Sequence, residues 1–196
     1  MHTRVCESLI LNNWHRDGSV QIFPYGLGKE ESMMNLTTGN NPGSSSFIEE
    51  RLAKKFRKSL PVQVVTVDSI AIQEGWFKDD SPPIYLMKVD VEGYEPIVFQ
   101  GGMQFQLLQS GKVENILMEN SVTDMRQVVD FFATIYKAGY KIKWVSSVNG
   151  QAYHPEALSQ IEEELSKATV GMELDGVGEA LKFLVKVNCN LWWTKR

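Results

Sequence analysis

Three charged side chains at the end of an apolar segment are the residues of this sequence best placed to do chemistry. Lys88, Asp90 and Glu92 alternate with valines in the last part of residues 84–91 and just beyond. Because side chains alternate along a strand, all three are expected on one face of its C-terminal tip. Charges there cost solvation free energy unless they pair, contact a ligand or reach water. The spacing therefore predicts either a ligand site or a local ion pair.

The surroundings of these three residues leave two interpretations. Gly93 follows directly and allows the backbone to turn sharply. Glu119 ends the next strand candidate, residues 113–119, and is expected beside the cluster. Lys88 paired with Asp90 or Glu119 would also serve as a partly buried ion pair that anchors two strand ends. Spacing alone slightly favours the ion pair, because charged residues are common where a strand leaves the core.

An alternation of strands and helices positions these side chains. The helix pattern is clearest over residues 124–137, where the apolar side chains fall on one stripe. Strands are expected at residues 84–91, 113–119, 140–146 and 183–193, and helices at 95–109, 124–137 and from Pro155 onward. Such alternation predicts right-handed crossovers over a mostly parallel sheet, and hence an α/β fold. Sheets of this kind bind ligands beyond the C-terminal ends of their strands.

The first third of the chain has weaker patterns. Residues 3–14 resemble the end of a helix, and residues 20–25 read as a short strand that glycines then break. A loop is expected at residues 40–46, a short helix at 47–58 and a β-branched strand at 62–67.

The composition is that of an ordinary globular protein. Of 196 residues, 43% are hydrophobic and 22% are charged, so one domain spanning residues 1–196 is expected. The net charge of −4, without a basic stripe, argues against a nucleic-acid partner. No apolar run has the length of a transmembrane helix.

Cysteine and histidine usage points away from metal chemistry. The two cysteines, Cys6 and Cys189, and the three histidines are scattered along the chain, so no metal site is predicted. The cysteines read as free thiols, and the first residues lack the apolar stretch of a secretory signal. Both observations favour a cytoplasmic protein.

Two neighbouring segments resemble the signature of FkbM-family methyltransferases. They are Lys88-Val89-Asp90-Val91-Glu92-Gly93-Tyr94-Glu95 and, after it, Val98-Phe99-Gln100-Gly101-Gly102. Other segments agree in order: the loop at residues 43–46, the turn at 66–70 and the strand end at 117–120. The resemblance covers about residues 10–145. It implies a Rossmann-like three-layer sandwich and S-adenosylmethionine-dependent O-methylation of a small molecule, glycan or lipid.

The resemblance also implies roles for the residues of the strand tip. Asp90 is the first candidate, and Glu92 the second, for the carboxylate that removes or orients the hydroxyl proton of the acceptor. Lys88 is expected to contact the substrate, and Glu119 to shape the acceptor pocket. The remaining requirement is positioning, because the acceptor oxygen must attack the methyl group in line.

The sequence departs from this family in its cofactor half. The Asp-x-Gly-x-x-x-Gly turn and the acidic end of the following strand are not found, and Gly26-Leu27-Gly28 is a lone Gly-x-Gly that reads as a turn. The first two strands of the fold are therefore expected to be missing. The contacts with the cofactor that are still expected are those of the Gly26 and Leu27 backbone with its adenine. Weak binding of S-adenosylmethionine, or none, is predicted. The alternative function is a catalytically silent domain that serves as a binding or interaction module.

Overall fold

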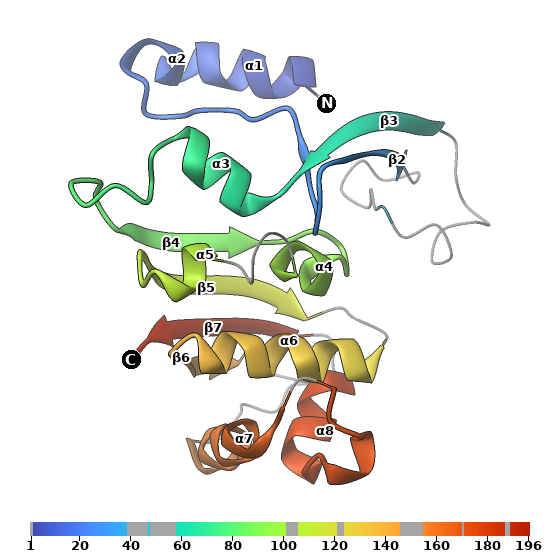
Figure 1. Ribbon diagram of the computed structural model, residues 1–196. Coiled ribbons are helices and arrows are strands. Elements are labelled where there is room, and N and C mark those ends of the chain that lie inside the picture. Colours follow the sequence, from blue (N-terminus) through green and yellow to red (C-terminus); the bar gives the residue numbers. More distant parts are fainter. Residues whose placement is uncertain are drawn as a thin grey trace.

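The computed structural model combines helices with two separate β-sheets, which confirms the predicted mixed α/β class (Figure 1). The structure describes residues 2–38, 47, 58–100, 106–120, 124–145, 155–169, 171–186 and 189–196. The predicted loop at residues 40–46, Gly101-Gly102 of the family motif and nearly all of the predicted helix at 47–58 lie outside the described residues; Lys58 begins a strand.

The smaller sheet has three strands in the order β1-β3-β2. Their bounds are Gly26–Leu27 for β1, Ser32–Thr38 for β2 and Lys58–Val65 for β3. β1 runs parallel to β3, and β2 runs antiparallel to it along its whole length. The predicted strand at residues 20–25 is wrong, because extended pairing begins only at Gly26.

The larger sheet has four strands in the order β4-β5-β7-β6. Their bounds are Ile84–Val89 for β4, Val113–Asn120 for β5, Tyr140–Val145 for β6 and Cys189–Lys195 for β7. β4 is parallel to β5, whereas β7 is antiparallel to both of its neighbours. Within the described part of the chain, β4 pairs only with β5, so its other edge has no strand beside it.

The prediction of a mostly parallel sheet is not confirmed, since both sheets are mixed. The reason lies in the segment before β7. A strand was predicted at residues 183–193, but Glu179–Lys186 forms helix α8, which follows helix α7 at Pro155–Lys167. One helix between two strands returns the chain to its starting end, whereas two helices leave it at the far end. β7 therefore enters the sheet in the opposite direction.

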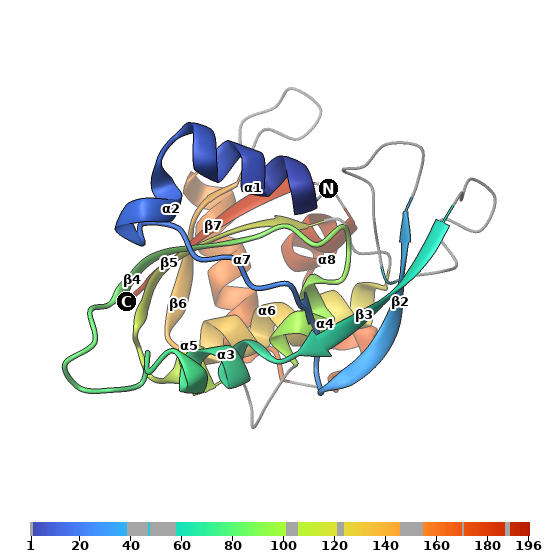
Figure 2. The ribbon, with the colours of Figure 1, turned by 90° about the horizontal axis from the view of Figure 1, so that it is seen from above.

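The helices pack mainly around the four-stranded sheet. Their remaining bounds are His2–Leu11 for α1, Trp14–Asp17 for α2, Val67–Gln73 for α3, Glu95–Phe99 for α4, Gln106–Gln109 for α5 and Met125–Lys137 for α6, with a 3-10 turn at Leu174–Gly176. α1 and α2 lie beyond β4 at one end of the molecule, and α7 and α8 at the other (Figure 1). Figure 2 shows α1 and α2 on the opposite side of the sheet from α4 and α6.

The hydrophobic core lies between the four-stranded sheet and α6, α7 and α8. Phe132 of α6 is completely buried, and its ring centroid lies 5.4 Å from that of Trp193 on β7. Tyr140 is also completely buried, and its hydroxyl donates a 2.7 Å hydrogen bond to the carbonyl oxygen of Val113. That bond satisfies the polar end of the tyrosine. This core packs against β5 and against Val89 at the C-terminal end of β4.

Candidate functional site

A cavity of about 530 Å³ lies beside β4. Its other walls are formed by residues 23–27 and by the segment from Val67, at the start of α3, to Trp76. It adjoins the C-terminal end of β4, where Lys88 and Asp90 contribute to its lining. Ligands bind beyond the carboxyl ends of strands in open α/β sheets. The cavity is therefore in the place where the fold class predicts a site.

The lining of this cavity is mostly apolar. Three aromatic side chains, those of Phe23, Tyr25 and Trp76, line it together with aliphatic residues of β4, α3 and α4. Lys88 and Asp90 are its charged lining residues. An apolar pocket with a small number of polar groups is typical of small-molecule sites.

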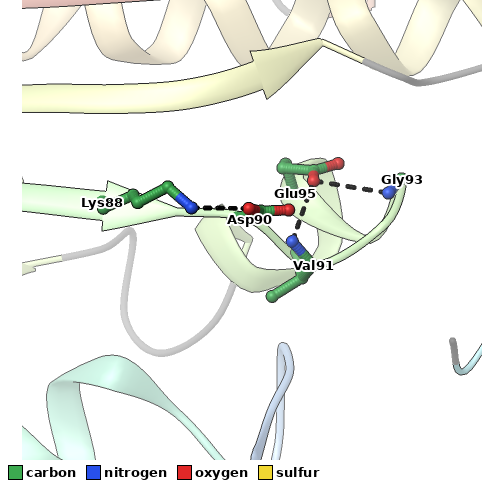
Figure 3. Close-up of polar contacts among 5 residues, drawn as sticks. All are labelled: Lys88, Asp90, Val91, Gly93 and Glu95. Carbon is green, nitrogen blue, oxygen red and sulfur yellow. Dashed lines mark hydrogen bonds and ion pairs between the residues drawn. The ribbon is translucent and has the colours of Figure 1, made fainter. Parts of the chain in front are cut away.

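Lys88 and Asp90 form an ion pair at the cavity. The Nζ of Lys88 donates to Oδ2 of Asp90 over 2.6 Å (Figure 3), and the two side chains are 62% and 40% exposed. This hydrogen bond, with the charge of Asp90, raises the pKa of Lys88. Of the two interpretations left open by the sequence, the ion pair is present. It does not join two strand ends, because both residues belong to one strand and its extension.

Glu92 is separated from the other two charged residues by a turn of the backbone. It has a φ of 53°, and the next residue, Gly93, has a φ of 90°. Left-handed backbone is uncommon for a residue other than glycine. β4 ends at Val89, so strand alternation no longer governs residue 92, and Glu92 is not among the residues that line the cavity. The structure thus brings two of the three predicted residues to the cavity.

Glu95 is a buried carboxylate at the end of the family motif, and the sequence alone predicts no role for it. Its side chain is fully buried, and its Oε1 accepts the backbone N–H groups of Val91, over 3.1 Å, and Gly93, over 3.3 Å (Figure 3). Burial raises the pKa of Glu95, and the hydrogen bonds from the backbone oppose that rise. A glutamate two residues after a glycine turn, among apolar neighbours, was the available signal.

Glu119, predicted to shape the acceptor pocket, lies on β5 within electrostatic range of the site. Its charge contributes to raising the pKa of both Lys88 and Glu95. It is not among the residues that line the cavity. Its position next to β4 follows from the parallel register, in which Lys88 pairs with Leu117. The structure therefore places Glu119 on the strand next to the ion pair and outside the cavity lining.

The glycines around β1 are accounted for by packing. A Cβ atom on Gly26 would lie 2.6 Å from the Phe47 ring, and one on Gly28 would lie 2.6 Å from Cγ1 of Val64. The N–H of Gly28 donates to the carbonyl oxygen of Val65 over 3.0 Å. Only glycine allows β1 to approach β3 this closely. Leu27 lines the cavity, whereas Gly26 does not.

A family model described as the methyltransferase FkbM domain matches residues 4–142. The chain belongs to this family. The matched span, which is more than half of the 196 residues, includes the cavity residues named above and confirms the resemblance drawn from the motif at residues 88–95. Comparisons with curated proteins and with solved structures gave no match.

The cavity of this FkbM domain does not fit S-adenosylmethionine as a complete binding site. The cofactor has an amino group, a carboxylate and two ribose hydroxyls that require polar partners. Among the described residues, the cavity offers two charged side chains, those of Lys88 and Asp90. The N–H of Gly28 is used in the β1–β3 pairing. The described lining therefore supplies fewer polar partners than the whole cofactor requires.

The described residues of the FkbM domain contain neither a clustered metal site nor a membrane-spanning helix. No group of three or more histidine, cysteine, aspartate or glutamate side chains among them has a geometry that could hold a metal ion. None of the helices in the same residues is both long enough and apolar enough to span a bilayer.

Proposed function

We propose that this chain supplies the acceptor side of an S-adenosylmethionine-dependent O-methyltransferase site, acting on a hydroxyl of a small molecule, glycan or lipid. Membership of the FkbM methyltransferase family supports the methyl-transfer class. The observation that carries the proposal is the Lys88–Asp90 ion pair in the wall of an apolar cavity. Family membership alone does not assign the acceptor or the residues.

Asp90 is proposed to handle the proton of the acceptor hydroxyl. An oxygen nucleophile becomes more reactive as its proton is removed, and a carboxylate within hydrogen-bond reach can accept or orient that proton. The side chain of Asp90 is 40% exposed and lines the cavity, so a bound hydroxyl can reach it. Glu92 remains the second candidate for this role.

Lys88 is proposed to orient the acceptor oxygen. A lysine ammonium has three N–H donors, and one of them bonds Asp90. A second donor directed at the hydroxyl oxygen would hold it beside the Asp90 carboxylate. Glu119 would then act on this pair through its charge, which favours the protonated form of Lys88. Positioning of this kind is the main task in a direct displacement at a methyl group.

The apolar lining of the cavity narrows the class of acceptor molecule that we propose. Phe23, Tyr25 and Trp76 offer apolar contact area. A glycan carries many hydroxyls, and each would need a polar partner when buried. A phenol or a long-chain alcohol needs only one polar contact, at its own hydroxyl. Among the three acceptor classes, the cavity therefore favours an aromatic small molecule or a lipid.

A methyl-transfer assay tests this proposal. The chain is incubated with S-adenosylmethionine carrying a radiolabelled methyl group, at millimolar concentration to offset weak cofactor binding, and with panels of phenols, long-chain alcohols and oligosaccharides. Labelled product is expected from the first two panels. Asp90→Asn should lower the initial rate about 10²- to 10⁴-fold, whereas Glu114→Gln, an exposed acid on β5, should not change it. An unchanged rate in Asp90→Asn would remove Asp90 from the proposal.

A second candidate function, a catalytically silent binding module, is favoured by the poor fit of the cavity to the cofactor. The same apolar lining would bind an aromatic or aliphatic ligand without any chemistry. Calorimetry separates the two functions, because the silent module binds an apolar alcohol and gives no saturable heat with S-adenosylmethionine. Cofactor binding in the low micromolar range would contradict this second function and the stated poor fit.

A further inference from the structure

We propose that Glu95 is the positioning residue of this site, holding the turn after β4 so that Asp90 is directed at Lys88 and the cavity. The catalytic part of this inference rests on the function proposed above. The structural part does not, because it concerns a backbone turn that exists without any ligand. Figure 3 shows the arrangement, with dashed lines from one oxygen of Glu95 to the backbone nitrogens of Val91 and Gly93.

The turn requires an external support. Glu92 and Gly93 are consecutive residues in left-handed backbone, with φ of 53° and 90°. A non-glycine residue in that region is strained, and such strain persists only where the surroundings fix the conformation. Glu95 provides that support, since one of its oxygens accepts the N–H groups on both sides of Glu92, those of Val91 and Gly93.

The anchored amides determine how Asp90 leaves the strand. The N–H of Val91 belongs to the peptide unit that Asp90 begins, so its bond to Glu95 fixes the orientation of that unit. β4 ends at Val89 and offers no ladder bond beyond that point. With this peptide unit fixed, Oδ2 of Asp90 lies 2.6 Å from Nζ of Lys88.

The burial of Glu95 is the second observation that supports this role. It is completely buried and its Oε2 has no hydrogen-bond partner within the described residues. Burying a carboxylate with one oxygen unpaired is unfavourable. An apolar side chain would fill the same space at lower cost but could not accept two amide hydrogens. The two amide hydrogen bonds that hold the turn offset part of this cost. We therefore attribute the buried carboxylate to its role in fixing the shape of the turn.

Amide hydrogen exchange and a lysine titration, both read by NMR, test the inference without any substrate. In Glu95→Ala, exchange at Val91 and Gly93 should accelerate at least tenfold, while the amide of Ile116 in β5 stays unchanged. The titration midpoint of Lys88 should fall towards its ordinary value, because Asp90 no longer faces it. Asp90→Asn gives the full fall for comparison. An unchanged exchange rate and midpoint in Glu95→Ala would overturn the proposal.

Two further variants separate positioning from a general loss of structure. Gly93→Ala strains the same turn from the backbone side and should lower the Lys88 midpoint as well, with no further fall when combined with Glu95→Ala. If Glu95→Ala does not fold, Glu95→Gln carries the test, since a neutral amide oxygen is a weaker acceptor. Exchange at Val91 and Gly93 should then rise several-fold with Ile116 unchanged. Equal acceleration at all three amides would show a merely structural role.

Failure of the catalytic proposal is distinguishable from failure of this one. If Asp90→Asn has no effect on methyl transfer, the proposed function fails, but the exchange and titration results still decide the role of Glu95 in the turn. If the catalytic proposal and the positioning proposal both hold, Glu95→Ala should lower kcat more than it raises KM. Glu95→Gln should then recover part of kcat. A change in KM alone would contradict positioning of Asp90.

Discussion

The two sheets of the molecule differ in how deeply they are packed. In the four-stranded sheet, Ile116 of β5 and Trp193 of β7 are completely buried against the helices. In the three-stranded sheet, Val64 and Val65 are the buried apolar side chains among those described, while Met33 and Leu60 are 67% and 49% exposed. The four-stranded sheet therefore contains most of the hydrophobic stabilisation of this fold.

The candidate site lies at the boundary between these two regions. β4 pairs with the well-packed β5 on one edge, and its residues also line the cavity that residues 23–27 and α3 close from the other side. β4 is thus held by β5 on one edge and faces the cavity on the other side. Functional groups on a paired strand keep their geometry, and the cavity leaves room for a ligand. The residues proposed to act thus lie at the exposed edge strand of the four-stranded sheet, whereas the residues that maintain the fold, such as Ile116 and Trp193, lie on its inner strands.

The largest expected effect is the loss of an aromatic side chain from the well-packed region. Phe132→Ala removes a ring that contacts Phe131 and Trp193 with centroid distances of 5.6 and 5.4 Å. The free energy of unfolding should fall by about 3–5 kcal/mol, as for other buried phenylalanines. Met33→Ala in the three-stranded sheet should change it by less than about 0.5 kcal/mol. Urea denaturation followed by circular dichroism measures both, and equal losses would contradict the comparison.

An intermediate effect is expected where the two regions are joined. Asp68 of α3 is buried, and its two carboxylate oxygens accept the N–H groups of Gln106, over 2.8 Å, and Leu107, over 3.0 Å, at the start of α5. Asp68→Ala leaves these donors without their acceptor, so unfolding should become easier by about 1–3 kcal/mol.

The matched variants for this junction are Asp68→Asn and Glu114→Ala. The asparagine keeps one acceptor oxygen and should lose about half as much stability as Asp68→Ala. Glu114 is exposed, and its replacement should have an effect within about 0.5 kcal/mol. The measurement is again urea denaturation. If Asp68→Ala were as mild as Glu114→Ala, the junction would not depend on this carboxylate.

The sequence predicted the elements whose patterns are local. α6 and β5 appear within one or two residues of the predicted ranges, because a periodic apolar stripe and an apolar run each report directly on burial. The motif at residues 88–95 also identified the family, which the match over residues 4–142 confirms. These signals need no knowledge of the rest of the fold.

The features that were missed depend on distant contacts. Strand β2 lies at Ser32–Thr38, where hydrophobic and polar residues alternate only weakly, and its pairing with β3 sets its extent. The direction of β7 depends on helix α8, whose residues also fit a strand pattern. Asp68 finds its partners 38 and 39 residues away. The roles of Glu95 and of the cavity aromatics likewise emerge only once the segments are brought together.

The smallest expected effect concerns a cap within the well-packed region. Oδ1 of Asp124 accepts the N–H groups of Arg126, over 2.9 Å, and Gln127, over 3.3 Å, at the start of α6. Asp124→Ala removes this cap and should lower the free energy of unfolding by about 1 kcal/mol. Asp124→Ser keeps an acceptor oxygen and should lose less.

Asp124→Ala also tests whether the packed region and the site are independent, because α6 packs on the four-stranded sheet and contributes no residue to the cavity lining. Amide exchange should accelerate in the first turn of α6 in Asp124→Ala, and exchange at Val91, in the turn beside the candidate site, should follow only the global change in stability. Terminal helical turns open locally at low free energy, so the effect of a lost cap stays near that end of the helix. A selective acceleration at Val91 would mean that the site and the packed core are coupled more tightly than their separate packing indicates.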